Sequence, residues 1–340
     1  MNPLCCVEGS RGVYVGACEP LLGQLLPKAN VVVVVDRQVR RLYPWLVATD
    51  RVVVIDGGEE HKTMQTIERI CRQFVEMGVD RSTFVLGIGG GVVTDMTGFA
   101  ASIYMRGLRF GFVSTTLLGE VDASVGGKNG VNLDGYKNMM GTFNQPEFVV
   151  CDPALLCSLS KRMLRAGLAE AIKTAIIGDV ALFECLEQSS FEMLRADTDL
   201  LSYIVSACIR LKSRVVSQDL RETGLRRLLN LGHTFAHAIE KCSHKMTHGE
   251  AVAVGLHLIA DLAVRMGRMK RADRDRIERL LRRYGFDLEL PVPLYRLVDA
   301  ASKDKKREAG ALHLVVPEAI GRCEVVDLSL AEFSRLLLAE

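Results

Sequence analysis

The sequence contains no apolar run long enough to cross a membrane. Although 49% of its 340 residues are hydrophobic, no apolar run reaches the roughly 18 residues that a transmembrane helix requires. Residues 1–6 also lack the basic segment and following apolar run of a secretory signal peptide. We therefore expect neither a membrane span nor a secretory leader.

Disulfide and zinc-finger patterns are missing too. Ten cysteines are scattered along the chain without a CxxC pair, which excludes the ligand spacing of a zinc finger. Scattered cysteines in a chain of this length are typical of reduced, mostly buried thiols, so we expect a cytoplasmic protein.

An excess of either charge is absent as well. The chain has 43 basic and 41 acidic residues, for a net charge of +2, and this balance carries no nucleic-acid footprint. We expect a small-molecule partner, and neither nucleic acid nor a membrane.

Short apolar runs organise the first 150 residues, at 31–35, 51–55, 84–88, 110–113 and 148–150. Such continuous runs predict parallel strands that are buried on both faces and joined by helices. Helical periodicity then dominates, in 161–177, 199–219, 224–241, 249–267 and 271–284, with a β pair at 312–316 and 323–326. The sequence predicts an α/β nucleotide-binding domain over residues 1–154, followed by a mostly α-helical domain over residues 155–340.

Histidine is scarce but clustered, since five of the seven histidines lie between residues 233 and 257. His233 and His237 are four residues apart and would share one helix face. With Glu170 and His248, His233 would form a His₂Glu set, a composition that suits catalytic zinc. Two other interpretations stay open: a polar helix face of hydrogen-bonded histidines, and a surface salt pair between Glu170 and Lys173.

A polar stripe is expected beside these histidines. Arg226, Asn230, His233 and His237 follow one another at spacings of four, three and four residues, so they would align on a single helix from 224 to 241. Such a stripe suits an anionic, oxygen-rich ligand. The charged run 304–307 is either a solvated segment or a loop that lends a lysine to the site.

Two glycine-rich turns follow predicted strands, at residues 56–62 and 89–95. Glycine lets the backbone approach a pyrophosphate, and a helix start supplies free N–H groups. Together with Thr115 and Thr116 these turns would form a dinucleotide cradle, although the GxGxxG fingerprint is absent and a plain tight turn is the alternative. Lys128 follows two further glycines and either faces a phosphate or is solvated.

In combination these motifs resemble the 3-dehydroquinate synthase family of the sugar-phosphate cyclase superfamily. The resemblance rests on GGGVVTD (89–95), RG (106–107), STTLLGEVDASVGGKNGVN (114–132), KN (137–138), GLAEAIK (167–173), LLNLGHTFAHAIE (228–240) and HGEAVAVG (248–255). It implies a Rossmann-like parallel-sheet domain followed by a helical metal-binding domain, and a homodimer.

The resemblance implies two cofactors, NAD and one divalent metal ion, zinc or cobalt. The implied metal ligands are Glu170, His233 and His248. The implied NAD-binding residues are Asp36, Asp56, Gly57, Gly58, Glu59, Glu60, His61, Lys62, Gly90, Gly91, Val92, Val93, Thr94, Asp95, Thr115, Thr116, Lys128, Lys137, Leu155 and Ser158. Three departures from the family pattern bear on NAD binding: Thr94 replaces a usual glycine, Gln38 a frequent asparagine, and Ser158-Leu159-Ser160 a usual Thr-Leu-Pro.

The resemblance also implies substrate contacts, which fall into three groups. The phosphate would meet Lys128, Asn138, His237 and either Lys305 or Lys306, with Arg106 reaching the phosphate site of the neighbouring subunit. The carboxylate would meet Lys212 and Arg226, beside Asn230. Asp122 and Lys173 would lie around the ring hydroxyls.

The implied reaction converts the sugar phosphate 3-deoxy-D-arabino-heptulosonate 7-phosphate to 3-dehydroquinate and phosphate, in the shikimate pathway to chorismate and the aromatic amino acids. It combines a transient oxidation by NAD, β-elimination of phosphate, re-reduction and an intramolecular aldol closure. Two alternatives are another sugar-phosphate cyclase, whose substrate lacks the carboxylate, and a metal-dependent alcohol or glycerol dehydrogenase.

Overall fold

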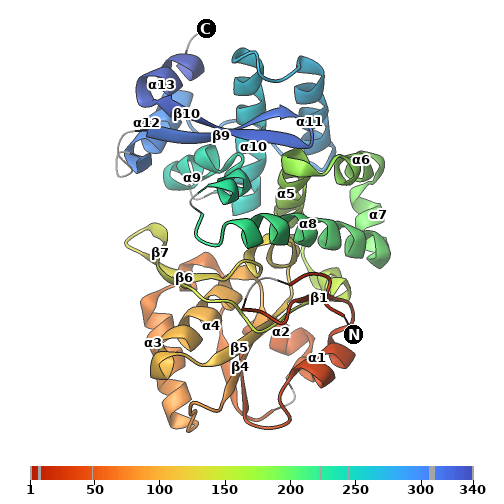
Figure 1. The fold of residues 1–340 in the computed structure, drawn as a ribbon, viewed down its shortest axis with the longest axis vertical. Helices are drawn as coiled ribbons and strands as arrows, with labels where there is room; N and C mark the ends of the chain where they lie inside the picture. The colour runs from red at the N-terminus through yellow and green to blue at the C-terminus, as the bar shows by residue number, and fades with distance from the viewer. Residues whose placement is uncertain are drawn as a thin grey trace. The chain divides into compact units, whose positions relative to one another are not determined.

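The structure is a computed structural model, and it describes residues 2–6, 9–47, 49–222, 224–243, 245–305 and 311–338 (Figure 1). Of residues 301–305 and 311 it describes the backbone alone. The chain forms two compact units, Met1–Leu164 with Thr198–Ser217, and Arg165–Asp197 with Gln218–Glu340. The domain boundary after residue 154 stays a prediction, and the units show in addition that residues 198–217 return to the first of them.

A parallel six-stranded sheet forms the centre of the first unit, with the strand order β1-β8-β5-β4-β2-β3. All five predicted strands are confirmed, because each predicted apolar run coincides with one. The strands are β1 (Val13–Val15), β2 (Val31–Asp36), β3 (Val52–Ile55), β4 (Phe84–Gly89), β5 (Arg109–Ser114) and β8 (Val149–Cys151). The sequence did not predict β1, which has three residues.

Burial on both faces explains why these strands are uniformly apolar. The side chains of Val32, Val33, Val34 and Val35 are all buried although they point alternately to opposite faces. The helices of this unit are α1 (Cys18–Leu25), α2 (Arg37–Leu42), α3 (Met64–Glu76), α4 (Gly91–Ile103) and α8 (Thr198–Gln218). Its shorter helical turns are η1 (Pro44–Leu46), η2 (Glu59–His61), η3 (Tyr104–Arg106), η4 (Gly119–Ala123) and η5 (Pro153–Ser158).

An antiparallel hairpin that the sequence did not predict joins η4 to β8. Its strands are β6 (Lys128–Leu133) and β7 (Tyr136–Phe143). Most side chains of β7 are exposed, so the segment has no buried apolar face to produce an alternating pattern. Its glycines therefore predicted only a loop at this place.

The second unit is mostly helical, as predicted. Its helices are α5 (Lys161–Gly178), α6 (Val180–Gln188), α7 (Phe191–Ala196), η6 (Leu225–Asn230), α9 (His233–Cys242), α10 (His248–Arg265), α11 (Arg271–Arg283), α12 (Leu294–Lys305) and α13 (Leu330–Leu338). The predicted β pair is confirmed as β9 (Ala311–Ala319) and β10 (Arg322–Ser329), which are antiparallel around Gly321. Helix α10 packs against α9 and α11 (Figure 1).

The predicted single helix from 224 to 241 is wrong. The chain forms the 3₁₀ turn η6, leaves helical geometry at Leu231 and Gly232, and begins α9 at His233. Gly232 has a φ of 76°, in the left-handed region that favours glycine. The proposed stripe of Arg226, Asn230, His233 and His237 is therefore not one face of a continuous helix.

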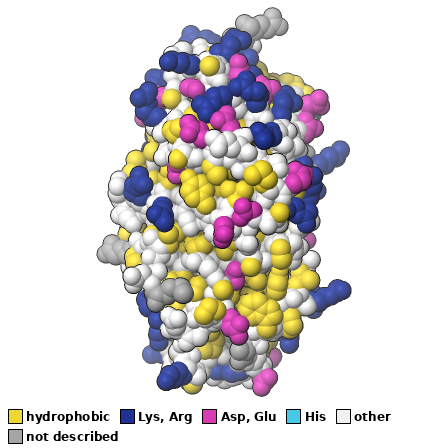
Figure 2. Space-filling model, turned by 90° about the vertical axis from the view of Figure 1, so that its right-hand side faces the viewer, with side chains coloured by type: hydrophobic (Ala, Val, Ile, Leu, Met, Phe, Trp, Pro, Cys, Tyr) yellow, Lys and Arg dark blue, Asp and Glu magenta, His cyan; other side chains and the backbone are white. Residues whose placement is uncertain are grey.

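Surface charge and thiols follow the composition. On the face drawn in Figure 2, basic and acidic side chains are interspersed toward the top of the view, as a nearly balanced chain predicts. All ten cysteines carry free thiols. Within the residues that the structure describes, no helix combines the length and apolarity that a membrane crossing needs.

Candidate metal centre and cofactor-binding residues

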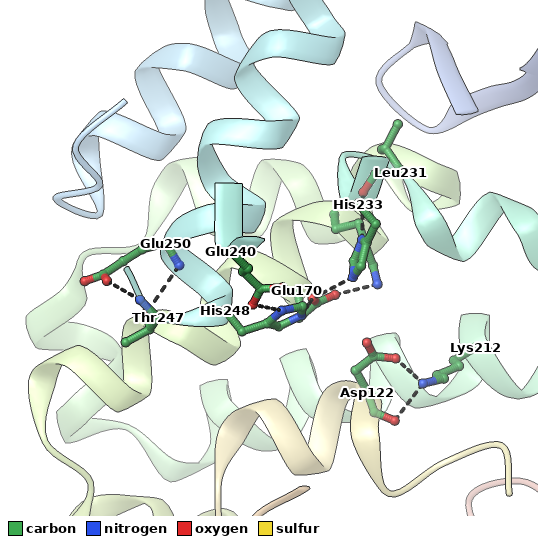
Figure 3. Close-up of polar contacts among 10 residues, drawn as sticks. Asp122, Glu170, Lys212, Leu231, His233, Glu240, Thr247, His248 and Glu250 are labelled. Atoms are coloured by element: carbon green, nitrogen blue, oxygen red, sulfur yellow. Dashed lines mark hydrogen bonds and ion pairs between the residues drawn. The ribbon is translucent and has the colours of Figure 1, made fainter. Parts of the chain in front are cut away.

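The second unit brings together one carboxylate and two imidazoles from three different helices. Glu170 lies within α5, His233 is the first residue of α9, and His248 is the first residue of α10. The Glu170 Oε1 atom is 3.2 Å from His248 Nε2 and 3.6 Å from His233 Nε2 (Figure 3). One potential ligand atom from each residue lies within 4.8 Å of the others.

Helix capping and a close helix contact fix the position of His248. The Thr247 hydroxyl accepts a hydrogen bond from the Glu250 backbone N–H, and the Glu250 carboxylate accepts one from Thr247 N–H at 2.7 Å. This capping box starts α10 at His248. A Cβ on Gly249 would overlap the backbone of Ala166, so only glycine lets the start of α10 lie directly against α5, which carries Glu170.

The Glu170 carboxylate is fully buried, with its side chain 0% exposed, and it lies 2.5 Å from the Lys173 ammonium, whose side chain is 3% exposed. The alternative of a surface salt pair is therefore wrong, because the pair lies in the interior. Burying a carboxylate is unfavourable unless a charge or hydrogen bonds compensate it. Lys173 supplies that compensation, and the two imidazoles occupy the remaining side.

The two histidines differ in their electrostatics. Burial, followed by the neighbouring Lys173 ammonium, lowers the pKa of His233 to about 3, so this ring is neutral at physiological pH. Burial also acts to lower the pKa of His248, but its hydrogen bonds to the Glu170 and Glu240 carboxylates raise it to about 9. A neutral imidazole offers a lone pair to a metal, and a divalent ion replaces a proton on the other.

This donor set fits zinc or cobalt. Two imidazole nitrogens and one carboxylate oxygen form the His₂Glu composition of catalytic zinc sites, which keep a position for a further ligand. Imidazole ligands suit several transition metals, so the set does not separate zinc from cobalt. Among the described residues, Glu170, His233 and His248 are the one group of this kind.

Three other predicted substrate residues are close to His233 in the sequence. The buried Arg226 donates from Nη1 to the Leu220 carbonyl oxygen at 2.7 Å. The Asn230 amide donates to the Glu222 carboxylate. The exposed His237 lies one turn after His233 on α9, with their ring centroids 5.4 Å apart.

The glycine turns of the first unit lie at the carboxyl ends of parallel strands, where ligands bind in such sheets. Gly90 precedes the first residue of α4, and a Cβ on Gly90 would come within 2.8 Å of the Thr116 side chain. The start of α4 has no side-chain cap, so its N–H groups remain suited to a phosphate. The Thr94 hydroxyl donates to the Gly91 carbonyl at 3.0 Å inside the helix, and its side chain is buried there.

Lys62 connects the two glycine turns and the hairpin. It is buried, and its ammonium donates to Asp95 Oδ2 at 2.6 Å and to Asn138 Oδ1 at 2.5 Å. Burial raises the pKa of Asp95, and the Lys62 ammonium opposes that effect. Asn138 was predicted to meet the substrate phosphate, whereas here its side chain accepts a hydrogen bond from the Lys62 ammonium.

The remaining predicted NAD-binding side chains occupy neighbouring strand ends. Asp36 Oδ1 accepts hydrogen bonds from the backbone of Gln38 and Val39 and so caps α2. The Asp56 carboxylate pairs with Arg37 at 2.6 Å, and Ser158 donates to the Leu155 carbonyl at 3.1 Å. Gly57, Gly58, Glu59, Glu60 and His61 follow β3, whereas Val92 and Val93 lie in the first turn of α4.

Asp122 of η4 and Lys212 of α8 are 90 residues apart in sequence but in contact in the first unit (Figure 3). The Lys212 ammonium donates to the Asp122 backbone oxygen at 2.7 Å and also to its carboxylate. Lys128 and Lys137 are exposed on β6 and β7, and Arg106 is exposed in η3. Lys306 lies outside the described residues, and the side chain of Lys305 is not described.

Family models for two adjacent parts of the chain match it. Residues 52–166 match the model described as 3-dehydroquinate synthase N-terminal, and residues 167–307 match the model described as 3-dehydroquinate synthase C-terminal. A protein named 3-dehydroquinate synthase from Dictyoglomus thermophilum is 40% identical over 83% of this chain and 80% of its own. The chain belongs to the 3-dehydroquinate synthase family.

The likeness to known proteins extends along nearly the whole chain. The protein of that name from Alkaliphilus metalliredigens is 38% identical over 97% of this chain and 96% of its own. A solved structure of 2-epi-5-epi-valiolone synthase from Streptomyces hygroscopicus subsp. jinggangensis 5008, with NAD⁺ and Zn²⁺ bound, superposes with a TM-score of 0.89 at 30% identity. It covers 98% of this chain and 97% of that one. The predicted fold class is confirmed.

Two glutamates to which the sequence assigned no role, Glu222 and Glu240, contact predicted site residues in the structure. Glu222 contacts Asn230 and has an unusual positive φ of 61°. Glu240 lies 3.0 Å from His248 Nδ1. The spacing from Glu240 to His248 crosses a break between two helices, so no periodicity relates them. Glu240 did stand inside a motif that the sequence singled out, and this was the one available signal.

Proposed function

We propose that this chain is a 3-dehydroquinate synthase, which converts 3-deoxy-D-arabino-heptulosonate 7-phosphate to 3-dehydroquinate and phosphate in the shikimate pathway. The observation that carries this conclusion is the group of Glu170, His233 and His248, the first two of them buried, in a chain that also has the glycine turn before α4. The relatives of that name, at 38% to 40% identity, support the same reaction.

Two cofactors are proposed. NAD bound at the strand ends of the first unit would accept a hydride from the C5 hydroxyl carbon and return it, so that the overall reaction is redox-neutral. A zinc or cobalt ion held by Glu170, His233 and His248 would act as a Lewis acid toward the substrate oxygens. The uncapped start of α4 suits the pyrophosphate of NAD.

The cationic residues have separate proposed tasks. Lys128, His237, Asn138 and Lys306 would orient the phosphate, which must leave by β-elimination, and Arg106 of a second subunit would join them. Arg226 would bind the substrate carboxylate through its planar guanidinium, and Lys212 and Asn230 would assist it. Lys173, paired with Glu170, and Asp122, paired with Lys212, would position the ring hydroxyls.

Two rival functions predict different products. A metal-dependent alcohol or glycerol dehydrogenase would produce NADH in stoichiometric amounts, whereas a cyclase for a substrate without a carboxylate would have no use for Arg226. We expect purified protein with catalytic NAD and Zn²⁺ to release phosphate from the heptulosonate phosphate without net formation of NADH. Accumulating NADH would establish the first rival. Faster turnover of a ketose phosphate of equal length that lacks the carboxylate would establish the second.

A homodimer is proposed from the hairpin surface. Leu133, Tyr136, Met139 and Phe143 are between 41% and 61% exposed along the hairpin β6–β7, and a subunit contact there would bury these apolar side chains. Light scattering should give twice the chain mass for the natural protein, and Met139→Lys should shift it toward the monomer. A natural protein of single-chain mass would contradict the dimer.

A cytoplasmic location is also proposed. Its support is the set of ten free thiols, because free thiols persist in a reducing compartment. Fractionation of the source cells should place the phosphate-releasing activity in the cytosol, and its recovery outside that compartment would contradict the proposal.

A further inference from the structure

The two histidines of the metal centre are oriented by different acceptors. Both rings direct Nε2 toward Glu170, and both have a hydrogen-bonding partner at Nδ1. The partner of His233 is the neutral backbone oxygen of Leu231, at 3.2 Å. The partner of His248 is the Glu240 carboxylate, whose Oε1 lies 3.0 Å from Nδ1 (Figure 3).

Glu240 is held where it can reach His248. It lies seven residues after His233 on α9, which puts both on the same side of the helix. Its side chain is only 9% exposed. A carboxylate this deeply placed needs partners that favour its charge, and the His248 ring N–H is one of them.

We infer that Glu240 is a positioning residue for the metal ligand His248. By accepting the Nδ1 proton it fixes the tautomer that leaves the Nε2 lone pair directed at Glu170. As a carboxylate it also makes the imidazole a stronger donor to a cation. Helix α9 thus supplies one ligand directly, through His233, and orients a second through Glu240. This inference rests on the proposed metal site.

Two substitutions separate the hydrogen bond from the charge. Glu240→Gln retains an oxygen that can accept from Nδ1 but removes the negative charge. Glu240→Ala removes both. Loss of such outer partners typically weakens metal binding about 10–100-fold, so we expect that range for Glu240→Ala and a smaller loss for Glu240→Gln.

Glu250→Gln is the matched control. Glu250 lies in the first turn of α10, two residues after His248, and its carboxylate accepts a hydrogen bond from the Thr247 backbone N–H. The substitution removes one negative charge from the same helix start and keeps an oxygen for the cap. We expect its metal affinity to match that of the natural protein.

The experiment measures binding without reference to activity. Full-length apoprotein, prepared with a chelator, is titrated with Co²⁺ by visible absorption and with Zn²⁺ against a chromophoric chelator, and circular dichroism checks the fold. A dissociation constant that rises for Glu240→Ala, with an altered Co²⁺ spectrum and an unchanged Glu250→Gln, supports the inference. If Glu240→Ala does not fold, a weaker affinity of Glu240→Gln than of Glu250→Gln carries the same conclusion.

Two results would overturn the inference, and they differ. Natural-like affinity and spectrum in both Glu240 variants would show that His248 is oriented without Glu240, while the metal site itself would stand. Absence of saturable Co²⁺ and Zn²⁺ binding in the natural protein would remove the metal site, and with it both the inference and the proposed function.

Discussion

Gly255 of α10 lies directly against Gly232, the residue that precedes α9. A Cβ on Gly255 would overlap the Gly232 carbonyl oxygen, and a Cβ on Gly232 would come within 3.0 Å of the Leu256 backbone nitrogen. Two residues without side chains thus let the segment that starts α9 touch the middle of α10. His233 follows this contact immediately, so its place in the metal centre depends on it.

Gly255→Ala should therefore disturb the metal centre as well as the fold. A methyl group against backbone cannot be relieved by a side-chain rotation, and forced overpacking costs roughly 1–3 kcal/mol. We expect a lower Tm and a lower Zn²⁺ content after dialysis. Gly23→Ala is the control, because nothing lies within 4 Å of its Cβ position in α1; it should be neutral or slightly stabilising. If the Gly255→Ala variant is destabilised but keeps its zinc content, the contact between Gly255 and Gly232 does not determine the placement of His233.

Chelation should abolish activity, and Zn²⁺ or Co²⁺ should restore it. The reason is that Glu170, His233 and His248 are proposed as the ligands of a Lewis-acid metal. His248→Ala should remain folded, since His248 is only partly buried at a helix start, but it should bind metal far more weakly. The check is phosphate release together with metal analysis. Full activity in exhaustively demetallated protein would exclude a catalytic metal.

Arg226→Lys should reduce kcat/KM on the order of tens- to a hundredfold, about 2–3 kcal/mol, because lysine keeps the charge but loses the planar fork that holds a carboxylate. Metal content should not change. Because Arg226 also donates to the Leu220 carbonyl, the Tm of the variant is measured alongside its kinetics.

Arg227→Lys is the control for that prediction. Arg227 lines a cavity of about 430 Å³ with Cys323, Glu324 and Val325 of β10. We expect the substitution to be nearly neutral for kcat/KM. Equal damage from the two substitutions, or a silent Arg226→Lys, would refute the carboxylate assignment.

Glu120→Gln should stabilise the protein above neutral pH. Glu120 is fully buried, and its two carboxyl oxygens have no hydrogen-bond partner among the described residues. Burial, and next the charge of Asp152, raise the pKa of its carboxyl well above the usual value of 4.5. The folded protein therefore keeps this proton to higher pH than the unfolded chain does. The contribution of Glu120 to the free energy of unfolding is fully present below the pKa that this carboxyl has in the unfolded chain. It is lost as pH rises toward the pKa that the carboxyl has in the folded protein.

The amide of the Glu120→Gln variant has no proton to lose, so the difference in Tm between variant and natural protein should grow as pH rises from about 4.5 to about 8. At the upper end of this pH range, we expect the free energy of unfolding of the variant to exceed that of the natural protein by on the order of 1 kcal/mol. The exposed Glu76→Gln should show little effect across the same range. A variant that is less stable than the natural protein at the upper end would mean that the ionised carboxylate is stabilised in the fold.

The sequence predicted those elements whose hydrophobic pattern is set by burial. The valine run of β2 and the long periodic helices α5, α8, α10 and α11 are of this kind. Strand β7 was missed because an exposed strand needs no such pattern. The break before α9 was missed because a single glycine, Gly232, is a weak local sign, and its contact with Gly255 joins residues far apart in the sequence.

The metal ligands could be predicted because their residue types are rare and chemically specific. The contacts that hold the site residues in place could not be predicted, since those of Asp122 with Lys212 and of Glu240 with His248 join residues from different elements. Side chains with no special chemistry, and contacts across long sequence separations, leave no periodic signal. Only the folded backbone brings them together.

The return of α8 to the first unit has a consequence for the order of events during synthesis. The sheet strands end at Cys151, but α8 follows only after residues 165–197 of the other unit. A contact of 2.9 Å between Cys5 Sγ and Ser213 Oγ spans 208 positions of the chain. A ribosome-bound chain that has emerged only to residue 164 thus holds all six strands of the sheet and Asp122, but neither α8 nor Lys212. The first unit to begin folding is completed only after the second has begun to emerge.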